Sequence, residues 1–155
     1  MLLTSTAFGP NGTIPERYTC DGEDESPPLT VVDAPAGTRS FAVIMHDPDS
    51  VHGDFAHWTL WNIGHDVREI KAGMVPDGAV EGMNDRDENG YTGPCPPPET
   101  GVHHYVFELL ALDMMPDLPS SATRDDLLKA CEGHELDRAE LVGLFGRDGA
   151  GSVSS

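Results

Sequence analysis

Ionisable side chains gather where apolar runs of this chain begin or end. Asp47 and Asp49 flank Pro48 directly after the apolar run 40–45, and His57 lies inside a second apolar run. A buried ionisable group costs free energy unless it is paired or hydrogen-bonded. This clustering therefore indicates a buried binding or catalytic site, although Asp and Pro are also the usual residues of a turn at the end of a strand.

A proline-rich loop, residues 90–101, precedes the next ionisable cluster. It contains four prolines and three glycines, so it is stiff and lacks several backbone donors. The N–H groups of Gly93 and Cys95 are then free to point at an anion. The same composition is typical of a stiffened surface connection, and a cis X–Pro bond is compatible with it.

Residues 102–113 carry the clearest strand pattern. Alternation places His103, Tyr105 and Phe107 on one face and His104 on the other. His103 and Tyr105 therefore point together if the segment is extended, and this connects the strand to the site.

Residues 56–63 are predicted to form another strand, with bulky side chains on both faces. Trp58 and Leu60 face one way, and His57 faces the other. A lone histidine in an apolar strand is more often a satisfied core residue than a functional one. Two more apolar runs are predicted to be strands: residues 29–32 and 40–45.

Two helices are predicted near the end of the chain. The first begins at a cap formed by Thr123 and Asp126 and ends at Gly133; the second begins after Asp137 and ends at Gly146. Strands followed by two helices predict a mainly β fold, a sandwich with helices packed at one edge. Residues 1–146 are expected to form a single domain, and residues 147–155 a flexible tail.

The chain is strongly acidic. Its 155 residues include 27 Asp and Glu against nine Lys and Arg, which gives a formal net charge of −18. This balance argues against binding to nucleic acid or to an anionic membrane surface, because both are polyanions. An ordinary acidic protein and adaptation to a high-salt cytoplasm explain the charge equally well. No apolar run is long enough to span a membrane, so we expect a soluble, cytoplasmic protein.

The three cysteines, Cys20, Cys95 and Cys131, show neither zinc-site spacing nor a disulfide framework. Free thiols in a reducing compartment are expected. A bridge from Cys20 to either Cys95 or Cys131 stays open, because spacing alone does not decide it.

Five segments share a family resemblance that runs in order along nearly the whole chain: residues 8–28, 35–41, 47–58, 90–113 and 140–143. Together they resemble the phosphatidylethanolamine-binding protein family, in its bacterial and archaeal Raf-kinase-inhibitor-like branch. The resemblance implies a two-sheet β-sandwich of Greek-key character with peripheral helices.

The resemblance also implies a ligand pocket, without a metal, a cofactor or catalytic residues. Its imidazoles, phenol and loop N–H groups would bind a phosphate or carboxylate, and a phosphoethanolamine head would suit it. An Asp would then bind the ligand ammonium or hold a histidine in its protonated form, and acid would tighten phosphate binding. The residues implied are Asp47, Pro48, Asp49, Phe55, His57, Gly93, Pro94, Cys95, Pro97, His103 and Tyr105.

Three functions are compatible with these residues. The first is a non-catalytic protein that binds a small anionic or zwitterionic ligand. The second is a phosphoester hydrolase that uses its His and Asp residues as metal ligands or as an acid–base pair, although no HExxH or GxSxG motif is present. The third is an interaction protein that inhibits a kinase or protease, and the resemblance also allows a homodimer.

Overall fold

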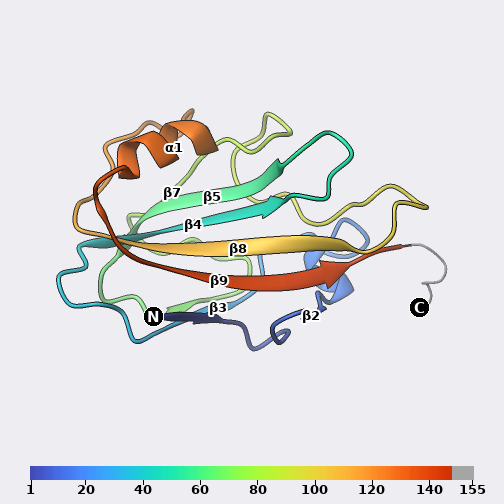
Figure 1. Cartoon of the computed structure of the whole chain (residues 1–155), viewed down its shortest axis with the longest axis horizontal. Helices are drawn as coiled ribbons and strands as arrows, with labels where there is room; N and C mark the ends of the chain where they lie inside the picture. The colour runs from blue at the N-terminus through green and yellow to red at the C-terminus, as the bar shows by residue number, and fades with distance from the viewer. Residues whose placement is uncertain (148–155) are drawn as a thin grey trace.

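The computed structural model describes residues 1–147, which fold into two packed β-sheets (Figure 1). The smaller sheet has the strand order β1-β3-β6, and the larger sheet has the order β2-β9-β8-β4-β5-β7. The predicted mainly β, two-sheet architecture is confirmed. The elements are β1 (Leu2–Thr4), β2 (Gly12–Thr13), the 3-10 helix η1 (Glu16–Tyr18), β3 (Leu29–Val32), β4 (Ser40–Asp47), β5 (Phe55–Gly64), β6 (Glu69–Ile70), β7 (Val80–Glu81), β8 (His103–Leu112), α1 (Arg124–Cys131) and β9 (Glu135–Phe145).

Strand β4 lies inside the larger sheet and is antiparallel to β5 on one side and to β8 on the other. Phe41 and Val43 pack into the core between the two sheets, whereas Ala42 and Ile44 pack into a second core beneath α1. A strand that is buried on both faces needs apolar residues at successive positions, which explains its continuous apolar run. The four predicted strands are confirmed, with ends shifted by two residues or fewer.

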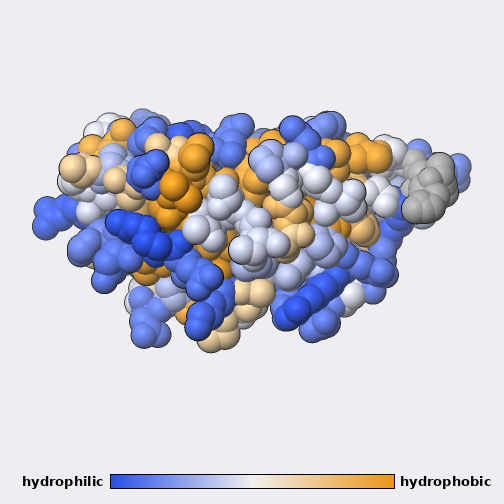
Figure 2. Space-filling model, turned by 90° about the horizontal axis from the view of Figure 1, so that it is seen from below, coloured by the Kyte–Doolittle hydropathy of each residue, from blue (hydrophilic) through white to orange (hydrophobic). Residues whose placement is uncertain are grey.

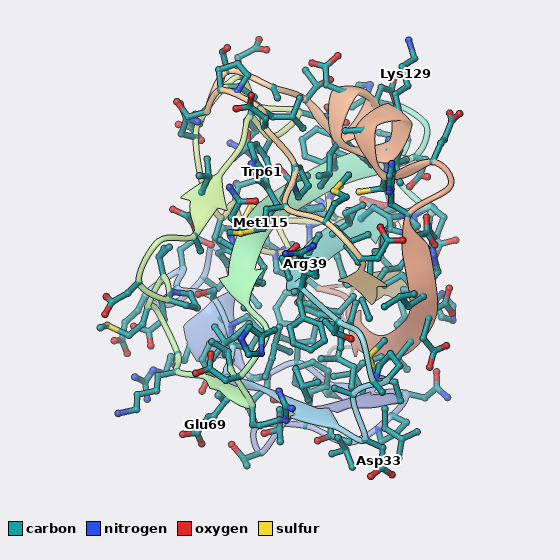
Figure 3. The ribbon with its side chains drawn as sticks, turned by 90° about the vertical axis from the view of Figure 1, so that its left-hand side faces the viewer. Asp33, Arg39, Trp61, Glu69, Met115 and Lys129 are labelled. Atoms are coloured by element: carbon teal, nitrogen blue, oxygen red, sulfur yellow. A yellow bond between two sulfur atoms is a disulfide. The ribbon has the colours of Figure 1, made fainter. Side chains whose placement is uncertain are left out.

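Helix α1 packs against the face of the larger sheet that points away from the smaller sheet. The Thr123 side chain accepts the N–H of Asp126, and the Asp126 side chain accepts the N–H of Thr123, so the predicted cap is confirmed. Leu127 and Cys131 belong to the same core as Trp61 of β5, which Figure 3 shows from the end of the molecule where β4 begins.

The second predicted helix is wrong, because residues 135–145 form strand β9, antiparallel to β8 along its length. Ala139 and Leu141 pack into the core between the sheets, while Glu140 is exposed. This alternation was visible in the sequence, but the Asp137 cap pattern favoured a helix. Strand β9 supplies backbone partners along the edge of β8 that β4 does not cover, and this pairing overrides the local helix signal.

The visible surface combines hydrophilic and apolar residues. Seen from below, hydrophilic residues surround separate apolar areas (Figure 2). Among the described residues, no helix has both the length and the apolar character needed to cross a bilayer.

Arg147, which was predicted to belong to the tail, forms an ion pair with Asp21. The rest of the predicted tail, residues 148–155, lies outside the described residues.

Candidate functional site

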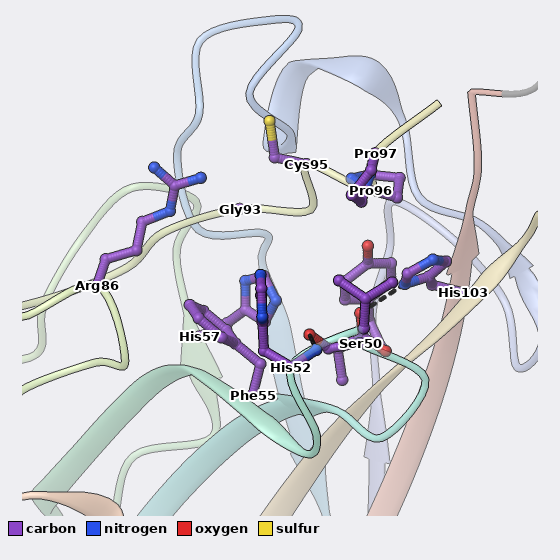
Figure 4. A pocket seen from close by; sticks show the side chains of 13 residues that line it. Ser50, His52, Phe55, His57, Arg86, Gly93, Cys95, Pro96, Pro97 and His103 are labelled. Atoms are coloured by element: carbon purple, nitrogen blue, oxygen red, sulfur yellow. Dashed lines mark hydrogen bonds and ion pairs between the residues drawn. The ribbon is translucent and has the colours of Figure 1, made fainter. Parts of the chain in front are cut away.

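A cavity of about 320 Å³ lies at the end of the larger sheet where β4 ends and where β5 and β8 begin (Figure 4). The loop that joins β4 to β5 forms one wall, and the proline-rich loop forms another. The lining residues are Asp47, Ser50, Val51, His52, Phe55, His57, Arg86, Gly93, Cys95, Pro96, Pro97, His103 and Tyr105.

Eight of the eleven predicted site residues line this cavity, and Pro48, Asp49 and Pro94 do not. The Asp49 carboxylate accepts the N–H of His104 at 2.8 Å and lies 2.7 Å from Nδ1 of the same residue, on the exposed side of β8. The Pro94 carbonyl accepts the N–H of Cys20 at 3.1 Å. The Asp-Pro-Asp turn therefore directs its first carboxylate into the cavity and its second away from it.

Asp47 and His103 form a buried pair in the cavity. Asp47 Oδ2 lies 2.7 Å from His103 Nδ1, and the two side chains are only 4% and 3% exposed. The other Asp47 oxygen accepts the N–H of Asp49 at 2.8 Å. Both carboxylate oxygens are thus engaged within the protein, and Nδ1 of His103 carries a proton to meet the carboxylate.

The second ring nitrogen of His103 faces the Thr100 hydroxyl. Thr100 Oγ1 lies 2.9 Å from His103 Nε2 and 2.7 Å from the carbonyl oxygen of Pro97. A hydroxyl has one hydrogen, so while Thr100 donates to Pro97 it can only accept from an N–H on Nε2. In that arrangement His103 carries protons on both nitrogens and is balanced by the Asp47 carboxylate.

A β-bulge turns His57 toward the same cavity. The register between β4 and β5 shifts between Met45 and His46, which leaves His57 as an extra residue on β5. Strict alternation had placed His57 on the face opposite Trp58. The bulge instead brings its ring within 5.3 Å of the Tyr105 ring, centroid to centroid.

His57 has one nitrogen left for a ligand. Its Nδ1 lies 2.7 Å from the carbonyl oxygen of Thr92, and a carbonyl only accepts, so Nδ1 carries the proton. Burial lowers the pKa of His57 below its ordinary value, although the Thr92 bond and the Asp47 charge act in the opposite direction. At neutral pH the Nε2 atom is therefore an acceptor, and it becomes a donor in acid.

Tyr105 lies between the two imidazoles. Its ring centroid is 5.3 Å from that of His57 and 6.2 Å from that of His103. Burial, with a contribution from the Asp47 charge, raises the pKa of Tyr105 far above its ordinary value, so the phenol keeps its proton. Within residues 1–147 this hydroxyl donates no hydrogen bond to another group of the protein, which leaves it available to a ligand.

A disulfide bond between Cys20 and Cys95 joins the proline-rich loop to the segment that follows η1. The expectation of free thiols is wrong for these two cysteines, and Cys131 is free and buried. Outside hyperthermophilic organisms, disulfides persist mainly in oxidising compartments. This bond therefore opposes the expectation of a reducing compartment, and the cytoplasmic location stays a prediction.

Hydrogen bonds also fix the proline-rich loop. The Gly93 N–H donates to Asp24 Oδ1 at 2.8 Å, so the prediction that this group is free for an anion is wrong. The Tyr91 hydroxyl donates to the Tyr18 carbonyl at 2.6 Å. A Cβ at Gly93 would clash with that same carbonyl, which explains why glycine is needed here. All peptide bonds of the described residues are trans.

Five lining residues were absent from the predicted site: Ser50, Val51, His52, Arg86 and Pro96. Four of them lie within three residues of a predicted residue in the sequence, and this proximity was the available signal. Arg86 comes from a separate loop, and only tertiary contacts bring it to the cavity. In the part of the chain that the structure describes, no group of three or more His, Cys, Asp or Glu side chains is placed to hold a metal ion.

Comparison with known proteins identifies the family. The model for the family described as phosphatidylethanolamine-binding protein matches residues 4–146. The chain belongs to this family. A UPF0098 protein of Methanothermobacter thermautotrophicus is 46% identical to this chain, over 95% of this chain and 99% of its own length.

Two solved structures of phosphatidylethanolamine-binding protein homologues share the fold. The homologue from Chlamydia trachomatis has a TM-score of 0.89 at 36% identity and covers 95% of this chain and 97% of its own. Escherichia coli YbcL, described as a member of the mammalian family, has a TM-score of 0.88 at 28% identity and covers 93% and 96%. The predicted family and fold are therefore confirmed.

Proposed function

We propose that this phosphatidylethanolamine-binding family member is a non-catalytic binding protein for a small ligand that carries a phosphate group. The observation that supports this most directly is the row formed by His57, Tyr105 and His103 along one cavity, with both histidines fixed by hydrogen bonds. A cavity of about 320 Å³ is within the range of small-ligand sites.

A phosphate oxygen would accept from the Tyr105 hydroxyl and from His57 Nε2 once that atom is protonated. Because Thr92 holds the other nitrogen of His57, a proton taken up on binding must go to Nε2. The bound anion would favour that proton, since an opposite charge nearby stabilises the imidazolium. Binding and proton uptake are therefore coupled in this proposal.

At His103 the ligand would replace the Thr100 hydroxyl as the partner of Nε2. Thr100 is exposed and can turn to solvent, whereas Asp47 is buried and keeps Nδ1. Of the two predicted roles for Asp47, the geometry supports holding His103 in its protonated form. It does not support binding of a ligand ammonium, because both carboxylate oxygens already have partners.

Two adjacent histidines allow a matched test. We expect His103→Gln to weaken the binding of inorganic phosphate at least about ten-fold, as for the loss of a charge-assisted hydrogen bond. His104→Gln changes the next residue, whose side chain points away from the cavity, and should alter the affinity by less than about two-fold. Isothermal titration calorimetry measures both.

Tyr105→Phe removes only a hydroxyl and keeps the packing, so it tests the site even if His103→Gln does not fold. We expect it to weaken phosphate binding about five-fold. Equal affinities in the wild-type protein, His103→Gln and Tyr105→Phe, or no phosphate binding by the wild-type protein, would refute the proposal.

A hydrolase is the second candidate, and the Asp47–His103 pair favours it. A carboxylate on Nδ1 orients a histidine so that Nε2 can exchange a proton with a substrate. Steady release of p-nitrophenol from p-nitrophenyl phosphate, lost in His103→Gln and kept in His104→Gln, would support this candidate over simple binding. A kinase or protease as partner, and a homodimer, stay predictions from the family resemblance.

A further inference from the structure

We infer that Arg86 makes this cavity selective for a ligand with two separated anionic groups, such as a phosphate ester that also carries a carboxylate. This inference rests on the proposed function, because it assumes that one anionic group binds to Tyr105 and the two histidines beside it. It specifies the charge of the second group of the ligand, the one that does not bind to Tyr105. The sequence had suggested a zwitterionic phosphoethanolamine head, and the arrangement of charges in the cavity points to a different chemistry.

Apart from the imidazoles of His52, His57 and His103, whose charges are conditional, the charged side chains that line the cavity are Asp47 and Arg86. Asp47 is already engaged by His103 in a buried pair. Within residues 1–147 four arginines pair with carboxylates, whereas Arg39, Arg68 and Arg86 form no ion pair, and of these three only Arg86 lines the cavity. In a chain with a net charge of −18, an arginine left without a carboxylate partner at a cavity is available for an anionic group of a ligand.

The backbone around Arg86 is fixed to the site. Asp85 and Ala56 exchange two hydrogen bonds: the Ala56 N–H donates to Asp85 Oδ2 at 2.7 Å, and the Asp85 N–H donates to the Ala56 carbonyl at 2.9 Å. The Arg86 N–H donates at 2.8 Å to Oδ1 of Asn84, whose side chain is buried. Ala56 lies between the lining residues Phe55 and His57, so these bonds tie the turn directly to the cavity wall.

Arg86 and His103 serve opposite ends of the cavity. In Figure 4 the Arg86 side chain enters from one side and His103 lies on the other, with His57 between them. The charge of Arg86 is close enough to His57 to help lower the pKa of that imidazole, after the larger effect of burial. The phosphate-binding part of the cavity thus offers His57, Tyr105 and His103, and the opposite end offers the guanidinium of Arg86.

The second ligand group must therefore be anionic. Asp47 is the only carboxylate in the described lining of the cavity, and both of its oxygens are engaged. An ammonium group would find no free carboxylate there and would face the guanidinium of Arg86. A carboxylate or a second phosphate would meet that guanidinium with a favourable charge and matching geometry.

Three phosphate monoesters separate these cases. 3-Phosphoglycerate and glycerol 3-phosphate differ only in the group at the far end, a carboxylate in the first and a neutral hydroxymethyl group in the second, and the shorter phosphoethanolamine ends in an ammonium group. We expect wild-type protein to bind 3-phosphoglycerate about five-fold more tightly than glycerol 3-phosphate, a modest factor because Arg86 is exposed. Phosphoethanolamine should bind no more tightly than glycerol 3-phosphate. Calorimetry at one fixed ionic strength gives all three affinities.

The variant Arg86→Gln should bind 3-phosphoglycerate and glycerol 3-phosphate equally, while its affinity for glycerol 3-phosphate stays within about two-fold of wild type. Arg39→Gln is the matched control: it removes the same charge from an exposed residue at the start of β4, the end remote from Asp47 (Figure 3). This control should keep the preference for 3-phosphoglycerate.

The possible results distinguish a failure of the inference about Arg86 from a failure of the phosphate-binding proposal. If phosphoethanolamine binds most tightly, or if Arg86→Gln keeps the full preference for 3-phosphoglycerate, the inference about the second anionic group is overturned while the phosphate-binding proposal stands. If the wild-type protein binds none of the three probes, both are overturned. If Arg39→Gln loses the preference as well, the effect comes from net charge, and the role of Arg86 is refuted.

Discussion

The last two residues of β4 lie in two sites of opposite character, on the two faces of one sheet. Asp47 points into the candidate ligand cavity, and His46 points into a smaller cavity on the face covered by α1. Both residues belong to histidine–carboxylate pairs with 2.7 Å contacts. The two faces differ in how completely their charges are balanced within the protein.

The face beneath α1 is balanced. His46 Nδ1 lies 2.7 Å from Asp54, and its Nε2 lies 2.7 Å from Glu108, so both nitrogens donate to carboxylates. Glu108 also pairs with Arg138, and Asp54 pairs with Arg124. The Glu108 bond raises the pKa of His46, and the His46 bond lowers the pKa of Glu108.

The cavity face keeps unused groups instead. The Tyr105 hydroxyl, His57 Nε2 and the Arg86 guanidinium have no charged or hydrogen-bonding partner among the described residues. Burial lowers the pKa of His57, whereas hydrogen bonds to carboxylates raise the pKa of His46. The same residue types thus support the fold where their partners are internal and form a candidate binding site where they are not.

The greatest loss of stability is expected from removing the disulfide that holds the proline-rich loop against the segment after η1. Replacing both Cys20 and Cys95 by Ser should lower the free energy of unfolding by roughly 4 kcal/mol, because the bond closes a long loop between residues 75 positions apart. Chemical denaturation measures the loss. Adding a reductant should produce a similar change in wild-type protein and none in the double variant; no response in wild type would contradict the disulfide.

Asp47→Asn should lower the free energy of unfolding by about 3 kcal/mol, because it leaves the buried His103 without its carboxylate. Asp49→Asn, two residues away, breaks an ion pair in which both side chains are about half exposed, and should cost less than about 1 kcal/mol. Urea denaturation of both variants compares the inward and outward carboxylates of a single turn. Equal losses of unfolding free energy in the two variants would show that burial of the Asp47–His103 pair adds no stability.

On the face beneath α1, His46→Gln should cost about 1 to 2 kcal/mol at pH 6, because Glu108 and Asp54 both lose a charged donor. The pKa of His46 is raised in the folded state, so its contribution is complete below the ordinary value of 6.5 and disappears as pH rises through the folded value. The free energy of unfolding of the wild-type protein should therefore fall as pH rises above 6.5. This pH dependence should be absent from His46→Gln. His134→Gln, which breaks an exposed pair with Asp113, is the control and should keep the slope.

On the cavity face the pH dependence has the opposite sign. The folded pKa of His57 is lowered, so neutral His57 contributes stability above pH 6.5 that is lost as pH falls through the folded value. Sulfate, which keeps its charge across this range, should bind several-fold more tightly as pH falls below 6.5, because binding favours the protonated ring. Calorimetric titrations at a series of pH values measure this, and His57→Gln should flatten the profile. A flat profile in wild type would argue against coupled protonation.

The smallest effect is expected from Thr100→Val. This change removes the hydroxyl that occupies His103 Nε2 and leaves that N–H to the ligand. We expect phosphate to bind about two- to three-fold more tightly, because one competing hydrogen bond to a charged group is removed. Weaker binding in this variant would show that Thr100 contacts the ligand or supports the wall.

The family, the two-sheet fold class, four of the strands, helix α1 and eight of the residues that line the cavity could be predicted from the sequence alone. These features follow from local patterns: alternation, apolar runs, a capping box and segments that resemble a family. Alternation along β8 was enough to place His103 beside Tyr105.

The remaining features depend on tertiary contacts. Strand β9 carries a helix-like cap, and its conformation is set by the open edge of β8 rather than by its own residues. The direction of His57 depends on a register shift against β4, and the position of Arg86 depends on hydrogen bonds to β5. Each of these features arises from contacts between residues far apart in sequence, and such contacts leave no periodic trace in the local pattern.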